Sequence, residues 1–165
     1  MTGCEQVRGL LTQKLEISGI PVVTAWTRGK LPQLTSAAAV LGVKETQSDD
    51  AALWNYLGEQ WDEIRGCCVE RYGRKLRLTL YVDFYAPKGA AEEIESGWEK
   101  LEEVLLTPLA EGLRMETVQR GETAADSASG YLKCRCTAQC TAYFTAVRTE
   151  ESAVLTDFTL KGVLQ

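Results

Sequence analysis

The sequence contains no histidine. This absence excludes serine–histidine–aspartate and cysteine–histidine catalysis, and it removes the imidazole ligand on which many zinc sites depend. An enzyme built on this chain would have to use Asp, Glu, Lys, Tyr or Cys side chains for its chemistry. Two common glycine-rich phosphate-binding patterns, G-x-G-x-x-G and G-x-x-x-x-G-K-[ST], are also absent. We therefore expect a protein that is not an enzyme and that holds no cofactor and no metal.

Positive charge and long apolar runs are scarce as well. The chain has 18 Lys and Arg residues against 23 Asp and Glu residues, which gives a formal net charge of −5. This balance argues against a dedicated nucleic-acid-binding protein. No apolar run approaches the roughly 18 residues that cross a membrane, and Met1–Ser18 carries polar side chains every few positions, unlike a signal peptide. The sequence predicts no membrane segment, no sequence-specific nucleic-acid binding and a cytoplasmic location.

The remaining composition is that of one ordinary folded domain. The chain has 165 residues, of which 45% are apolar and 25% are charged. A chain of this size buries about two thirds of its extended surface when it folds, so it can form a core without disulfide bonds. We expect residues 1–165 to form a single domain.

Hydrophobic periodicity predicts helices among several strands. Val7, Leu11 and Leu15 recur at helical spacing after a T-x-x-E capping box that begins at Thr2, and Ser18-Gly19 ends this helix. The expected helices are 2–17, 90–106 and a further turn at 108–113; the expected strands are 22–26, 37–45, 74–86, 114–120, 131–147 and 154–163, with polar loops at 121–130 and 149–152. This order predicts an α+β fold, with a largely antiparallel sheet packed against two main helices.

Residues 47–72 interrupt this pattern and are expected to form a protruding loop or hairpin arm. The arm is acidic and polar, yet it contains the large rings of Trp54, Tyr56 and Trp61. Such rings are enriched in the centres of protein interfaces. Two interpretations stay open: the three aromatics pack back onto their own domain, or they form an interface between subunits.

The cysteines resemble a metal motif only at first sight. Cys134, Cys136 and Cys140 fall on one apolar face of a strand, where the outer two lie roughly 20 Å apart, too far for one tetrahedral metal. We expect all three to be reduced core residues. In the adjacent pair Cys67 and Cys68, we expect one buried and one exposed thiol.

Two clusters of charge are expected to be solvated surface. The first is the glutamate-rich helix, with Glu92, Glu93, Glu95, Glu99, Glu102 and Glu103; the second is basic, with Arg71, Arg74, Lys75 and Arg77. For the basic cluster, a patch that contacts DNA or an acidic subunit is the alternative.

Taken together, the order of elements resembles the tail terminator and head–tail joining proteins of long-tailed bacteriophages and prophages. The resemblance rests on the first helix with its Ser18–Pro21 ending, the strand 74–85 followed by Ala86–Gly89 and a helix, and the segment Asp157–Gly162. It implies a structural virion protein that assembles as a homo-oligomeric ring, usually a hexamer, and contacts the tail tube protein and the head connector. It also implies assembly in the bacterial cytoplasm and a final place in the virion tail, with no catalytic residue.

Two other functions stay open from the sequence. One is a small-molecule-binding domain, with a pocket between sheet and helix lined by Phe84, Trp98, Phe144 and Phe158. The other is a histidine-independent enzyme that uses Cys, Lys or Asp, which would need a thiol of depressed pKa in a cleft.

Overall fold

Long antiparallel strands organise the chain, and two helices lie against them. The computed structural model describes residues 3–23 and 33–148 and the backbone of 159–160. The elements are α1 (Gly3–Ile17), β1 (Val22–Val23), β2 (Ala38–Asp50), the 3-10 turn η1 (Leu53–Asn55), β3 (Tyr56–Asp62), β4 (Cys67–Ala86), α2 (Ala91–Leu106), β5 (Leu113–Ala125), β6 (Leu132–Arg148) and β7 (Thr159–Leu160). Within these ranges, neither helix has the length and apolar character needed to cross a membrane.

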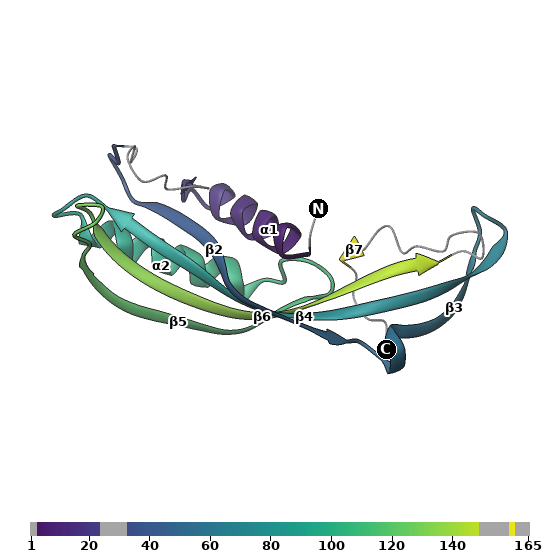
Figure 1. The fold of residues 1–165 in the computed structure, drawn as a ribbon. Coiled ribbons are helices and arrows are strands. Elements are labelled where there is room, and N and C mark those ends of the chain that lie inside the picture. The colour runs from purple at the N-terminus through teal and green to yellow at the C-terminus, as the bar shows by residue number, and fades with distance from the viewer. Residues whose placement is uncertain (1–2, 24–32, 149–158, 161–165) are drawn as a thin grey trace.

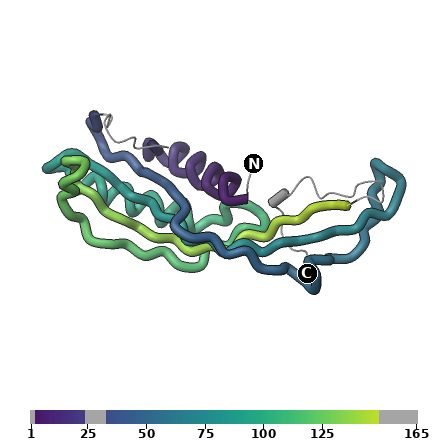
Figure 2. The backbone as a smooth tube through the Cα atoms, in the orientation of Figure 1, coloured from purple at the N-terminus to yellow at the C-terminus, as the bar shows by residue number. Residues whose placement is uncertain are grey.

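The pairing of β4 with β6 forms the spine of the sheet. The strand order is β1-β2-β4-β6-β5, β3 also pairs with β4, and β7 pairs with β6. Every pair is antiparallel except β1 with β2. This architecture confirms the expected α+β fold with a largely antiparallel sheet. Because β4 has 20 residues and β6 has 17, the molecule is elongated and curved (Figure 1, Figure 2).

The two ends of the spine have different neighbours. At one end β2 and β5 flank it, and both helices cover one face (Figure 1). At the other end β3 and β7 flank it, and neither α1 nor α2 reaches over that end. The hydrophobic core therefore lies under the helices, and the second end projects as an arm.

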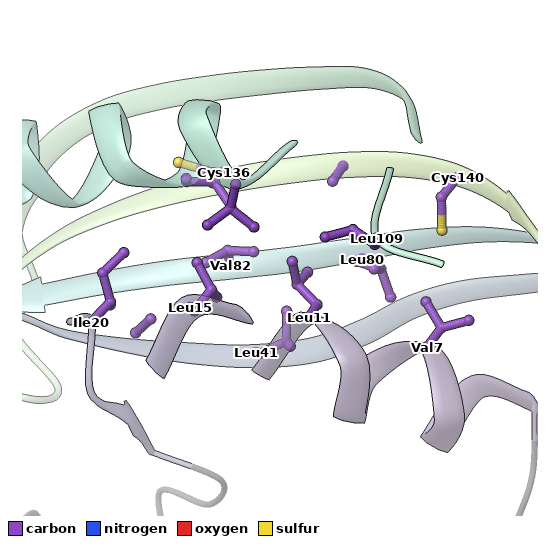
Figure 3. Close-up of a cluster of buried hydrophobic side chains, with 14 of the residues drawn as sticks. Val7, Leu11, Leu15, Ile20, Leu41, Leu80, Val82, Leu109, Cys136 and Cys140 are labelled. Atoms are coloured by element: carbon purple, nitrogen blue, oxygen red, sulfur yellow. The ribbon is translucent and has the colours of Figure 1, made fainter. Parts of the chain in front are cut away.

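The core forms where the two helices meet the apolar side of β4. Val7, Leu11 and Leu15 of α1 are fully buried, as the helical spacing predicted. They pack with Leu80 and Val82 of β4 in one cluster (Figure 3). Such a continuous apolar layer is what makes the helical end of the sheet stable.

Helix α2 packs slightly rotated from the expected stripe. Ile94 and Leu101 are fully buried, but Trp98 is only partly so, and Gly97 faces the sheet instead. A Cβ atom at Gly97 would lie 3.0 Å from the ring of Phe84, so the missing side chain lets the helix approach the sheet closely.

The end of α1 follows the prediction from Ser18-Gly19. Gly19 has a φ of +79°, its N–H donates to the carbonyl of Glu16 at 3.0 Å, and the N–H of Ile20 donates to that of Leu15 at 3.0 Å. These two bonds form a Schellman motif, which satisfies carbonyls that the helix end leaves free. Thr2 of the expected capping box lies outside the described residues.

Two predicted segments are wrong. Residues 108–113 do not form a helical turn: Gly112 adopts a φ of +79° and its carbonyl accepts the N–H of Tyr143 at 2.8 Å, so the chain turns directly into β5. Residues 121–130 are not all loop, because β5 continues to Ala125 after a bulge between Arg120 and Thr123, and only the turn 126–130 remains. In both places backbone hydrogen bonds to β6 decide the structure.

Other strand limits differ by extension. β2 runs to Asp50 and β4 begins at Cys67, so both enter the region 47–72 that was expected to be an arm. Of the predicted strands 22–26 and 154–163, only Val22–Val23 and Thr159–Leu160 are described, and the turn 149–152 lies outside the described residues.

Candidate functional site

The expected arm is a β-hairpin made by β3 and the first part of β4. Tyr56 pairs with Tyr72 and Asp62 with Cys67, with a bulge after Tyr56. Residues 63–66 close the hairpin, where the carboxylate of Asp62 accepts the N–H groups of Ile64 and Arg65, both at 3.0 Å. This turn is held by local backbone contacts rather than by a core.

The hairpin and the preceding turn η1 together carry most of the large exposed apolar side chains of the described structure. Ile64 is 98% exposed, Trp54 84% and Trp61 58%, and Leu53 and Tyr56 are also exposed. We call these five residues the arm patch. The sequence identified its three aromatics but missed Leu53 and Ile64, although an isoleucine within an otherwise polar turn was an available signal. Trp54 and Trp61 do not pack into the core, so the arm presents them to solvent.

The strand register determines how the aromatics of the arm patch are placed. Tyr56 and Trp61 lie opposite Tyr72 and Cys68, which share one face of β4. Tyr56 also contacts Tyr72 edge to face, with ring centroids 5.6 Å apart. Trp54 lies apart from them in η1, where β2 ends and β3 begins. The structure thus places Tyr56 and Trp61 on one face of the hairpin and Trp54 in the turn before it.

The backbone at Trp54 is strained. Its φ is 58° and its ψ is 25°, the left-handed conformation, and the next residue, Asn55, has a φ of 63°. Asparagine tolerates this region, but a bulky side chain there costs of order 1–2 kcal/mol. Trp54 is therefore both strained and exposed, and its side chain does little to stabilise the monomer.

A second surface is the side of β2, β4, β6 and β5 that faces away from the helices, here called the open face. Side chains alternate along a strand, so Tyr81 and Asp83 lie on the open face while Leu80 and Val82 pack in the core. At its centre Asp83 is 2% exposed. Arg135 donates two hydrogen bonds to its carboxylate, at 2.7 and 2.6 Å, and Lys133 lies 2.9 Å away.

Cations of the open face lie over tyrosine rings. Arg135 lies 5.3 Å from the ring centre of Tyr81, Lys133 lies 5.2 Å from that of Tyr85, and Lys75 lies 5.8 Å from that of Tyr143. Burial alone would lower the pKa of Lys133, but interactions with Tyr85 and Asp83 outweigh it and raise that pKa. A shallow hollow of about 320 Å³ adjoins these pairs, lined by Glu45, Gln47, Arg77, Thr79, Glu116 and Gln139 among others.

Two of the four residues in the basic cluster of the sequence form ion pairs at the surface. Arg74 bonds to Asp50 at 3.0 Å and to Ser48, and Arg77 pairs with Asp49 at 3.2 Å. This arrangement agrees with the interpretation of the cluster as solvated surface charge.

The glutamates of α2 are mostly exposed, as expected. Glu93 differs, because its carboxylate accepts the backbone N–H of Ala37 at the start of β2. Glu95 forms two hydrogen bonds with Arg120 of β5, and these bonds lower the pKa of the Glu95 carboxyl.

Three of the six cysteines are buried, two are exposed and Cys4 is partly buried. Cys134, Cys136 and Cys140 are free and buried, as predicted, and burial raises the pKa of both Cys136 and Cys140 to about 12. No group of three metal-ligating side chains occurs within the described ranges.

The prediction for the adjacent pair of cysteines is wrong, because Cys67 and Cys68 are both exposed. They lie at the end of the arm, beyond both helices, and of the described strands only β3 pairs with them. Neither of the two described helices covers the strand at this point.

Two of the residues expected to line a small-ligand pocket lie in the core. Phe84 is fully buried and Phe144 is 2% exposed, while Phe158 lies outside the described residues. A hollow of about 190 Å³ lies between α2 and the sheet, lined by Ser36, Phe84, Glu93 and Lys100 among others. It is smaller than the roughly 300–1,000 Å³ typical of drug-sized ligand sites.

Comparison of the chain with protein-family models finds no match, and comparison with curated proteins finds none either.

Proposed function

We propose that this protein is a structural component of a bacteriophage or prophage tail, a ring-forming tail terminator or head–tail joining subunit. The observation that carries the proposal is the arm patch, whose strained and exposed Trp54 adds little to the fold of a single subunit. Tyr56 and Trp61 share one face of the arm, and exposed apolar side chains grouped on one face mark contact sites. The proposal gives them a partner: neighbouring subunits and the end of the tail tube.

The sheet edges support assembly. β5 forms one edge of the sheet and β3 lies at the edge of the arm, so each has a side that pairs with no described strand. Unpaired strand edges need protection or a partner. The bulges and the charged side chains of β5 protect this edge against pairing with strands of unrelated chains. In a ring, the next subunit would cover the unpaired edges.

The partners in this proposal are other copies of the chain, the tail tube protein and the head connector proteins. The subunit would assemble in the cytoplasm of the bacterial host and remain in the virion tail. It would act by shape and contact rather than by catalysis. Burial raises the pKa values of Cys136 and Cys140, so neither thiol suits a nucleophile, which needs a depressed pKa and access to substrate.

Genetics can test the proposal directly. The gene should lie among phage tail genes, and its deletion should abolish particles in which heads are joined to tails of uniform length. Wild-type protein supplied in trans should restore them. The double variant Trp54→Ala/Trp61→Ala should restore them at least about tenfold less well, because each buried ring can contribute about 2 kcal/mol or more to an interface. Normal particles in the deletion strain would contradict the proposal.

A matched variant separates assembly from folding in that experiment. Ile17→Ala also removes an exposed apolar side chain, at the end of α1 and away from the arm. It should complement like wild type. If Ile17→Ala fails as badly as the double variant, the defect is general and the role given to the arm patch is wrong.

A further inference from the structure

We propose that neighbouring copies of this chain stack head to tail, with the acidic side of α2 in one copy lying on the open face of the next. This inference rests on the proposed function, and it names which two surfaces meet in the ring. The two surfaces lie on opposite sides of the same subunit, because both helices pack on the core side of the sheet.

The first surface is the solvent side of α2. Its five exposed glutamates follow one stripe along the helix: Glu92, Glu95, Glu99, Glu102 and Glu103. The opposite side of the helix holds Ile94 and Leu101 in the core. Only Glu95 of the five has a cation beside it, Arg120, in the described structure. The stripe is therefore strongly negative and largely unpaired.

The second surface is the open face, which carries more cations than carboxylates. The strand register places six cations on it: Arg71, Lys75, Arg77, Arg114, Lys133 and Arg135. The carboxylates on it are Glu45, Asp49, Asp83 and Glu116. The whole chain has a net charge of −5, yet the open face carries an excess of positive charge. This charge is complementary to the negative charge of the α2 stripe.

The types of side chain on the open face also suit a protein partner. Tyrosine and arginine are enriched among the residues that contribute most to the binding energy of interfaces. The open face provides both types, since Tyr81 lies beside Arg135 and Tyr143 lies beside Lys75. A second copy of this chain, which carries the acidic α2 stripe, supplies the complementary charge.

The dimensions agree with a helix lying on the sheet. α2 has 16 residues, so it is about 24 Å long. The stretch of β4 from Lys75 to Tyr85 spans about 33 Å, with β2 and β6 beside it. A contact between two different surfaces of one chain is heterologous, and such contacts close into rings when the rotation between copies allows it.

Charge reversal in two complementary variants tests the contact. The helix variant is Glu99→Lys/Glu102→Lys/Glu103→Lys, and the sheet variant is Lys75→Glu/Arg114→Glu. Sedimentation velocity of the purified full chain at low and high salt measures self-association. Wild-type association should weaken with salt, and each variant alone should associate at least about tenfold more weakly, because two like-charged surfaces then meet.

An equimolar mixture of the two variants should restore association. The basic helix of one variant then meets the acidic sheet of the other, and the remaining pair of surfaces is unchanged, so the two variants alternate. Arg8→Glu/Lys14→Glu is the control: it changes the net charge as much as the sheet variant does, but on the exposed side of α1. It should associate like wild type.

Three results would overturn the inference. Both variants could associate like wild type, which would place the contact elsewhere and leave the proposed ring intact. The mixture could fail to restore association. The wild type could also stay monomeric up to about 1 mM. This result would overturn the inference both if the wild type binds single-stranded DNA that the sheet variant does not bind and if it binds no DNA. The genetic test of tail assembly is independent of all three results, so the two proposals can fail separately.

Discussion

Replacing Trp54 with glycine should remove the largest side chain of the arm patch and leave the folded subunit about as stable as before. Trp54 is 84% exposed, so only about 40 Å² of a side chain that can bury up to about 250 Å² is covered. Losing that area costs about 1 kcal/mol. Glycine also adds freedom to the unfolded chain, which costs about 0.4–1 kcal/mol.

The backbone term acts in the opposite direction. At a φ of 58° a tryptophan is strained and a glycine is not, so the substitution regains about 1–2 kcal/mol. The terms nearly cancel, and the free energy of unfolding should change by less than about 1 kcal/mol. In the same protein Leu11→Ala should cost about 2–5 kcal/mol, because Leu11 is fully buried in the core.

Urea unfolding followed by circular dichroism measures both variants, since this signal does not depend on the tryptophan that is removed. Trp54→Gly should keep the wild-type midpoint and still fail to support assembly. If Trp54→Gly unfolds as easily as Leu11→Ala, then Trp54 belongs to the fold of the monomer, and the argument that its exposed ring serves assembly is refuted.

Three further substitutions test the core, the helix end and the surface pairing. Cys136→Ser should lower the free energy of unfolding by about 1–3 kcal/mol, because it buries a hydroxyl; unchanged stability would contradict the burial of this thiol. Gly19→Ala should cost about 1 kcal/mol, because φ is +79° there, and a neutral effect would argue against the Schellman motif. In an NMR titration the pKa of Glu95 should lie below its ordinary value, because Arg120 bonds to its charged form, and Arg120→Gln should return this pKa to the ordinary value. Any contribution of the pair to stability is present above the ordinary pKa of a glutamate and is lost as the pH falls through the lowered pKa.

Much of the fold could be predicted from the sequence because its signals are local. The period of two from Leu76 to Phe84 identified the central strand, and the helical spacing of Val7, Leu11 and Leu15 identified α1 with its buried side. Ser18-Gly19 fixed the end of that helix, because only a residue that tolerates positive φ fits there. These features depend on neighbours along the chain, so one sequence suffices to find them.

The errors arose where pairing partners decide the structure. Residues 121–125 have small and polar side chains, yet they form part of β5 because β6 offers them backbone partners. Residues 67–73 lack clear alternation, yet they extend β4 because β3 and β6 pair on both sides. A proline after a threonine suggested a helix at 108–113, but Gly112 and the bond to Tyr143 turn the chain into a strand. Such long-range bonds leave little trace in the side-chain pattern.

The candidate site was found in part for the same reason. Trp54, Tyr56 and Trp61 were recognised by the contrast between large rings and polar neighbours, which is a local signal. The open face could not be recognised, because Tyr81, Arg135 and Lys133 come together only through the pairing of β4 with β6. Their polar spacing along each strand reads as ordinary solvent exposure until the register is known.

The central claim, that the arm is covered on assembly, can be measured with the protein's own thiols. Cys67 and Cys68 are exposed on the arm, and they pair across from Asp62 and Trp61. Cys136 and Cys140 serve as the internal reference, because burial raises their pKa to about 12 and only a small fraction is thiolate near neutral pH. Labelling followed by peptide mass spectrometry gives the rate at each cysteine in free subunits and in assembled tails. We expect the rates at Cys67 and Cys68 to fall at least about tenfold on assembly while the reference thiols stay unlabelled; equal rates in free and assembled protein would contradict the account.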